Sequence, residues 1–155
     1  MFKKIITLTG LIIAAAALPV NSAIAADGLV TVKSAHDVAT TVEKLVAVLE
    51  SKGMNVFAQV NHSAGAEKAG LELRPTELVL FGNPKVGTPL MQCSQSIAID
   101  LPQKMLAWQD EDGTVYLSYN DPMHLKSRHA TEGCDAVFGK VSGALGKFAA
   151  AATAP

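Results

Sequence analysis

Lys104–Tyr119 reads KMLAWQDEDGTVYLSY, two apolar runs joined by a short polar turn. Residues 104–109 and 114–119 are rich in aliphatic and aromatic side chains, which favour strands. Between them, Asp110–Gly113 is typical of a hairpin turn, because Asp and Gly adopt the backbone angles that such a turn needs. The segment therefore predicts an antiparallel hairpin.

Three further segments have the composition of strands. They read LVTVK, MNVFAQVNH and TELVLF, at Leu29–Lys33, Met54–His62 and Thr76–Phe81. The first two alternate apolar and polar residues, whereas the third is nearly continuous and apolar, as in a central strand. We also expect Ile97–Pro102 to be extended, because proline restrains the residue before it.

Helical spacing of apolar residues follows the first strand and returns near the C-terminus. Ser34 and Asp37 come close to a capping box, and apolar residues then recur every three or four positions as far as Lys52–Gly53. A last amphipathic helix is expected over about 134–150. The alanine-rich tail from Ala149 is expected to fray.

Two short helices are expected between these elements, after Pro84 and Pro122, because proline suits the first position of a helix. The chain then reads strand, helix, four strands and helix. This order predicts an α+β fold, with an antiparallel sheet and helices packed on one face.

The N-terminus has the pattern of a secretory signal peptide. Two lysines precede an apolar run over residues 5–20, and Ala23-Ile24-Ala25 fits the small-residue rule for cleavage between Ala25 and Ala26. A membrane helix is the alternative, but it needs roughly 20 continuous apolar residues, and Pro19 interrupts this run. We therefore predict a protein exported to the periplasm.

Cleavage would divide the chain into a leader over 1–25 and a single domain over 26–155. The leader holds two of the 13 basic residues and none of the 14 acidic ones, so the mature net charge is 11 − 14 = −3 with His neutral. Nucleic acids and anionic membranes bind clustered Lys and Arg. Neither is expected as a partner.

Two cysteines, Cys93 and Cys134, follow the predicted leader. A disulfide is expected in an exported protein. Two separate buried thiols are the alternative. Neither cysteine belongs to a C-x-x-C motif, so the spacing does not indicate a thioredoxin-type site.

Four motifs carry a resemblance to a known family: FGNPKVGTPLM, DLP before a strand, WQDEDG and YNDP. In this order they resemble the domain of unknown function 302 (DUF302) family over about residues 28–129. The resemblance implies a β-α-β(4)-α fold like that of the TATA-binding protein, without implying DNA binding. Some members are dimeric, and the family has no established reaction. The two cysteines are not part of its pattern.

The two predicted helix starts after Gly82 and Tyr119 form the best candidate site, because free backbone N–H groups there attract anions and carbonyl groups. Asn and Asp side chains at these starts would face a ligand, and nearby residues add a cation, a hydroxyl and an aromatic wall. The candidate ligand-binding residues are Asn83, Lys85, Thr88, Tyr119, Asn120 and Asp121. Simple capping of the two helices is the alternative.

Four histidines could suggest a metal site, but none has the spacing of metal ligands. Solvated or hydrogen-bonded histidines are the simpler interpretation. His62 is the histidine to test first, because it ends a strand just before a loop of small residues. No metal and no cofactor is predicted.

The sequence favours a binding domain over an enzyme, because it contains no recognisable catalytic set. A small molecule, a periplasmic protein or a second copy of the chain is the expected partner. Two alternatives stay open. One is an enzyme or redox accessory protein that works through His62 or through Cys93 and Cys134, and the other is a structural interaction module.

Overall fold

The central element is a five-stranded sheet in which all neighbouring strands run antiparallel. The computed structural model describes residues 28–155, so the predicted leader lies outside the described residues. The strands are β1 (Leu29–Lys33), β2 (Asn55–Asn61), β3 (Thr76–Gly82), β4 (Gln103–Gln109) and β5 (Val115–Asn120), in the spatial order β1-β5-β4-β3-β2. The predicted hairpin is β4–β5, in which Met105 pairs with Tyr119. The predicted antiparallel sheet is thus confirmed.

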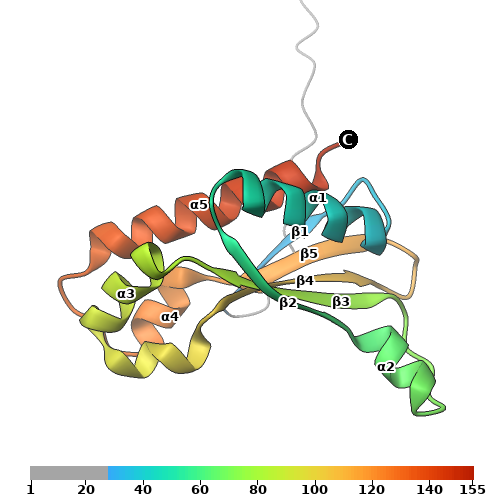
Figure 1. The fold of residues 1–155 in the computed structure, drawn as a ribbon, viewed down its shortest axis with the longest axis horizontal. Coiled ribbons are helices and arrows are strands. Elements are labelled where there is room, and N and C mark those ends of the chain that lie inside the picture. The colour runs from blue at the N-terminus through green and yellow to red at the C-terminus, as the bar shows by residue number, and fades with distance from the viewer. Residues whose placement is uncertain (1–27) are drawn as a thin grey trace, which may run out of the picture.

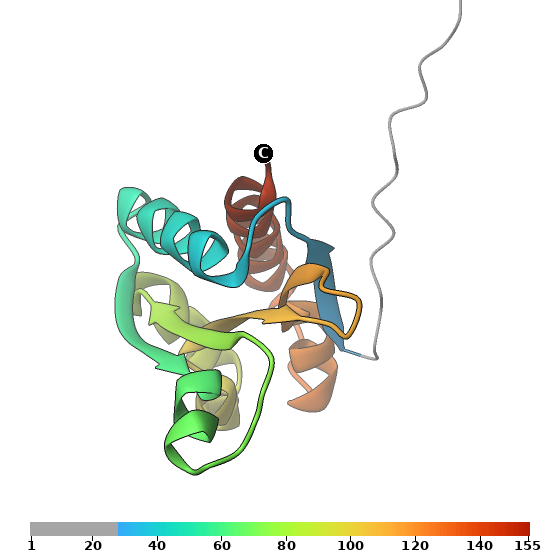
Figure 2. The same ribbon diagram turned by 90° about the vertical axis from the view of Figure 1, so that its right-hand side faces the viewer.

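Two long helices, α1 (Val38–Ser51) and α5 (Asp135–Thr153), lie side by side over one face of the sheet (Figures 1 and 2). Because α1 joins β1 at one edge to β2 at the other, it crosses the sheet. The short helices are α2 (His62–Lys68), α3 (Pro84–Cys93), the 3-10 helix η1 (Gln95–Asp100) and α4 (Pro122–Arg128). The predicted α+β class is confirmed. Over residues 28–155, no helix has both the length and the apolar character to cross a membrane.

The core lies between this helix pair and the inner face of the sheet. Alternate residues of β3 and β4 point into it, as the two-residue period of a strand requires. Its largest fully buried side chains include Leu45 and Leu49 of α1, Val79 and Phe81 of β3, Met105 of β4 and Phe138 of α5. The ring of Phe81 meets that of Phe148 edge-on at 6.3 Å. On the other face of the sheet, Trp108 stacks on Tyr116.

Helix α1 begins later than the capping-box pattern predicts. Asp37 is its N-cap, and its carboxylate accepts a hydrogen bond of 2.7 Å from the backbone N–H of Thr40. This bond lowers the pKa of Asp37. Ser34 does not cap the helix: its hydroxyl contacts the hydroxyl of Thr41 over 2.7 Å, while its backbone N–H donates to the Val115 carbonyl of the sheet.

The segment Ile97–Pro102 is not extended, contrary to the prediction. Residues 95–100 form η1, and the backbone becomes extended at Leu101, directly after it. Proline restrains only the residue immediately before it, so Pro102 acts on Leu101 and no further. Burial of Ile97 instead favours the 3-10 turn.

The alanine-rich tail does not fray, contrary to the prediction. Helix α5 continues to Thr153, and the side chains of Ala149 and Ala152 are fully buried. The Thr153 carbonyl accepts a hydrogen bond of 2.9 Å from the backbone N–H of Ala35. Tertiary packing therefore holds a helix end that composition alone would leave free.

Candidate ligand-binding site

An apolar pocket of about 570 Å³ opens at the end of the sheet where β3 passes into α3. Its walls come from the start of β2, the end of β3, helix α3 and the connection from η1 to β4. The lining residues are Met54, Phe57, Gly82, Asn83, Pro84, Val86, Gly87, Thr88, Leu90, Met91, Ala98, Leu101, Pro102 and Gln103. Small-molecule sites usually have volumes of roughly 300–1,000 Å³, so this space suits a ligand.

The turn from β3 into α3 fixes the shape of the apolar pocket. The Asn83 side-chain oxygen accepts a hydrogen bond of 2.9 Å from the Lys85 backbone N–H, and its amide nitrogen donates to the Gly53 carbonyl over 2.8 Å. One side chain therefore caps α3 and holds it against the turn between α1 and β2. A Cβ at Gly82 would lie only 3.2 Å from the ring of Phe57, so glycine allows this aromatic wall to pack closely.

The walls are adaptable and mostly hydrocarbon. Met54 and Met91 contribute flexible thioether side chains, which adjust to ligands of different shape. The ring of Phe57 is 58% exposed although it lines the pocket, so it lies where water meets the cavity. Thr88 and Gln103 supply a hydroxyl and an amide. None of the lining residues carries a carboxylate, imidazole, thiol or ammonium group.

The structure divides the predicted site residues into two places. Asn83 and Thr88 line the apolar pocket. Lys85 lies on the first turn of α3 with its side chain exposed, and it is not part of the lining. The Asn83 side chain is already used for capping, as the alternative interpretation proposed for this residue.

The second helix start lies two strands away, because β4 separates β5 from β3. The Asp121 carboxylate caps α4 by accepting a hydrogen bond of 2.9 Å from the Met123 N–H, and Asn120 pairs with Leu29 in the sheet. Tyr119 is buried in the core, and burial together with the Asp121 charge raises the pKa of its phenol. None of these residues lines the apolar pocket.

His62 is the first residue of α2, where its side chain is exposed. It lies outside the lining of the apolar pocket. Across residues 28–155, no three His, Cys, Asp or Glu side chains come together in a way that could hold a metal ion. His62 has no partner here that would indicate a catalytic role.

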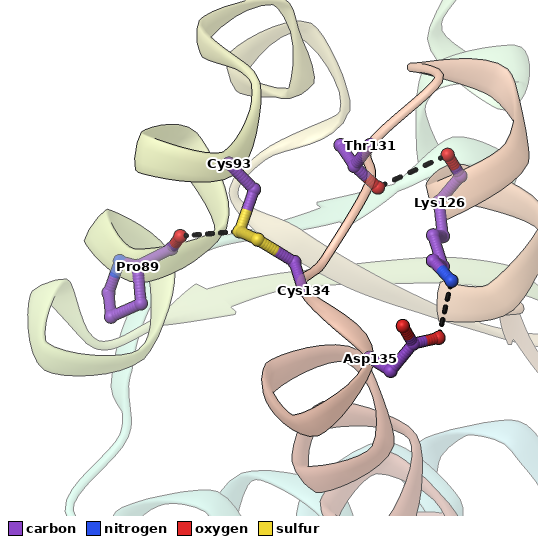
Figure 3. The surroundings of a disulfide bond; sticks show 6 residues. All are labelled: Pro89, Cys93, Lys126, Thr131, Cys134 and Asp135. Carbon is purple, nitrogen blue, oxygen red and sulfur yellow. Dashed lines mark hydrogen bonds and ion pairs between the residues drawn. A yellow bond between two sulfur atoms is a disulfide. The ribbon is translucent and has the colours of Figure 1, made fainter.

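The two cysteines link the wall of the pocket to the core helix (Figure 3). Cys93 ends α3 and Cys134 precedes α5, and their sulfur atoms are at the bonding distance of 2.03 Å, which supports the predicted disulfide. Next to it, Lys126 forms an ion pair with Asp135, and the hydrogen bond and charge of Lys126 lower the pKa of Asp135.

Sequence reasoning missed most of the pocket. Phe57, Gly87 and Gln103 lie on three separate elements, and no local motif marks them as neighbours. The sequence carried two signals. One is the motif FGNPKVGTPLM, which supplies the lining from α3, and the other is Phe57 among the polar residues on one face of its strand, which becomes informative only when the register of β2 is known.

Comparison with known proteins reveals relatives with a longer chain. Over 112 residues, the chain is 53% identical to proteins named fluoride-specific ion channel FluC 1 from Brucella suis and Brucella abortus, and to one named FluC 2 from Brucella melitensis. The match covers 72% of this chain and 44%, 42% and 42% of the three relatives. This chain therefore spans less than half the length of these relatives.

These names correct the predicted localisation. We predicted a protein released into the periplasm, whereas the relatives at 53% identity are named ion channels, which work in membranes. Export signals were the basis of the prediction, and a signal-like N-terminus does not identify the final location of a chain. The names of these relatives therefore contradict the prediction of a periplasmic protein.

The fold has a solved counterpart. An uncharacterized conserved DUF302 protein from Bacillus stearothermophilus superposes with a TM-score of 0.72 at 19% identity, over 80% of this chain and 97% of that one. The family model described as "Domain of unknown function DUF302" matches residues 30–148, beyond the end at about 129 that the motifs indicated. The chain belongs to the DUF302 family.

Proposed function

We propose that this domain binds a small apolar molecule in the apolar pocket. The observation that carries the proposal is a cavity of about 570 Å³ whose walls are almost entirely hydrocarbon. Transfer of apolar surface out of water contributes about 25 cal/mol per Å². A ligand that covers the exposed side chains of Phe57 and Val86 would remove apolar surface of both the protein and the ligand from water, which favours binding.

The chemistry of the walls narrows the class of ligand. Burying a charge without a partner is costly, and the lining offers none. Thr88 and Gln103 can orient one weakly polar group. The ligand that fits best has an uncharged apolar body, such as a hydrocarbon chain or an aromatic ring system.

Filling the apolar pocket from within tests this function. Gly87 lies in α3, and a Cβ built there meets only Leu101 at 3.8 Å, so a larger side chain at this position would enter the cavity. We expect the neutral dye N-phenyl-1-naphthylamine to fluoresce more strongly with the wild-type protein, and Gly87→Leu to weaken its binding at least tenfold, which is about 1.4 kcal/mol.

The control places the same substitution in another helix. Gly65 of α2 lies outside the pocket, and a Cβ at this position would meet no atom within 4 Å, so Gly65→Leu should bind the dye like the wild type. Equal binding by both variants, with thermal melting showing both to be folded, would contradict binding in the apolar pocket.

A second candidate function follows from the relatives. Because their longer chains are named fluoride-specific ion channels, we propose that this domain is an accessory module of such a channel. Removing the matched region from the Brucella suis relative is expected to change fluoride efflux from reconstituted vesicles, and adding this chain should reverse the change. Unchanged efflux on removal would argue against an accessory role.

A further inference from the structure

A chain of hydrogen bonds joins Asp100, His129 and Ser96 outside the apolar pocket. His129 Nε2 lies 2.6 Å from Asp100 Oδ2, and its Nδ1 lies 2.9 Å from Ser96 Oγ. Asp100 and Ser96 belong to η1, whereas His129 directly follows α4. The fold thus brings together a hydroxyl, an imidazole and a carboxylate from two separate segments.

The three side chains joined by these hydrogen bonds differ in their exposure to solvent. The side chains of His129 and Asp100 are only 7% and 10% exposed, whereas Ser96 is exposed to solvent. Arg128 Nη1 contacts the second carboxylate oxygen of Asp100 at 3.1 Å. The carboxylate and the imidazole are therefore fixed and shielded from water, while a molecule from solution can reach the hydroxyl.

The hydrogen bonds define which nitrogen can act as a base. An ionised carboxylate only accepts, so His129 Nε2 must carry the hydrogen that it donates to Asp100. In the neutral ring, Nδ1 then has a free lone pair directed at the Ser96 hydroxyl. This is the arrangement by which an aspartate and a histidine activate a serine, and it is recognised by geometry, not by the order of residues in the chain.

We propose that Ser96 is a nucleophile toward acyl and phosphoryl esters, with His129 as its general base and Asp100 as the positioning residue. In attack on an ester, the bond from Ser96 Oγ to the carbonyl carbon forms and the Ser96 proton moves to His129 Nδ1. The ester C–O bond then breaks, and the leaving alcohol takes that proton. Water hydrolyses the acyl-serine through the same base and restores the enzyme.

A matched serine lies beside the proposed nucleophile. Ser94 Oγ is 3.0 Å from Ser96 Oγ, whereas the hydrogen bond to His129 comes from Ser96. If these contacts serve only to hold η1 against α4, neither hydroxyl should be more reactive than an ordinary serine. Comparing the two serines separates a nucleophile from a structural contact.

Labelling with a fluorophosphonate tests the proposal. In this reaction the bond from Ser96 Oγ to phosphorus forms, the P–F bond breaks and fluoride leaves, while the proton passes through His129 to water. Peptide mass spectrometry should find the adduct on Ser96 of the folded protein and none after urea unfolding. Ser96→Ala should abolish it, and Ser94→Ala should label within threefold of the wild-type rate. Absence of the adduct from Ser96 in the wild type overturns the proposal.

His129→Ala tests the base. We expect it to lower the labelling rate about 100-fold, the usual scale of general base catalysis. Free imidazole should restore part of the rate, because removal of a side chain that is 7% exposed leaves space for the added ring. A purely structural role gives no such rescue. Wild-type labelling by a folded His129→Ala variant would overturn the role of the base.

Asp100→Asn tests the positioning residue through the orientation of the imidazole ring. The Asp100 carboxylate accepts the hydrogen of His129 Nε2 and so directs the Nδ1 lone pair at Ser96. An asparagine amide can present either a donor or an acceptor to Nε2, so the labelling rate should fall, and Asp100→Glu should restore part of it. Wild-type labelling by a folded Asp100→Asn variant would rule out positioning by Asp100.

Discussion

Replacing Cys93 and Cys134 together by serine is expected to lower the free energy of unfolding by about 4 kcal/mol. The two cysteines are 41 residues apart in the sequence, and a cross-link of that span restricts the unfolded chain strongly. The bond also joins α3 to α5, which fixes one wall of the apolar pocket to a core helix. Urea denaturation of the oxidised wild type and of the double variant measures the difference.

Reduction of the wild-type protein provides the control for this prediction. Under reductant, the wild type should unfold at about the same urea concentration as the double variant, because both then lack the cross-link. The dye-binding assay on the two proteins shows whether the pocket also loosens. A loss of stability below about 1 kcal/mol would mean that native strain or a restricted unfolded chain offsets the entropic gain.

The strands could be predicted because their pattern is local. In β4 and β5, aliphatic and aromatic residues flank a turn rich in Asp and Gly, and the pairing needs no information from elsewhere in the chain. The motif FGNPKVG likewise marks the end of β3 and the proline-initiated start of α3. Local sequence and tertiary structure agree at these places.

The missed features depend on contacts between distant segments. The end of α5 is held in this way, because the Thr153 carbonyl accepts a hydrogen bond from the backbone N–H of Ala35, far away in the sequence. The hydrogen-bond chain of Ser96, His129 and Asp100 arises in the same way, since its two segments are 33 residues apart at the Ser96–His129 contact. The two helix starts were expected to share one site, but the strand order places β4 between them.

Ala149→Asp is expected to destabilise the fold by about 3 kcal/mol or more, because it would bury a carboxylate without a partner. Composition predicts that this tail frays, and in a frayed tail the same change would cost almost nothing. Ala149 is instead 0% exposed, on the face of α5 that packs into the core. Thermal and urea denaturation of the variant therefore measure directly whether packing holds the end of α5.

The neighbouring position supplies the matched control. Ala150 is exposed on the same turn of α5, so Ala150→Asp adds the same charge at nearly the same distance from the helix end. The unfavourable interaction of the new carboxylate with the helix dipole is about equal in the two variants. The difference between their free energies of unfolding therefore measures the cost of burying the carboxylate. We expect Ala150→Asp to stay within about 0.5 kcal/mol of the wild type. Equal stability of the two variants would mean that the tail is frayed in solution, as its composition suggests.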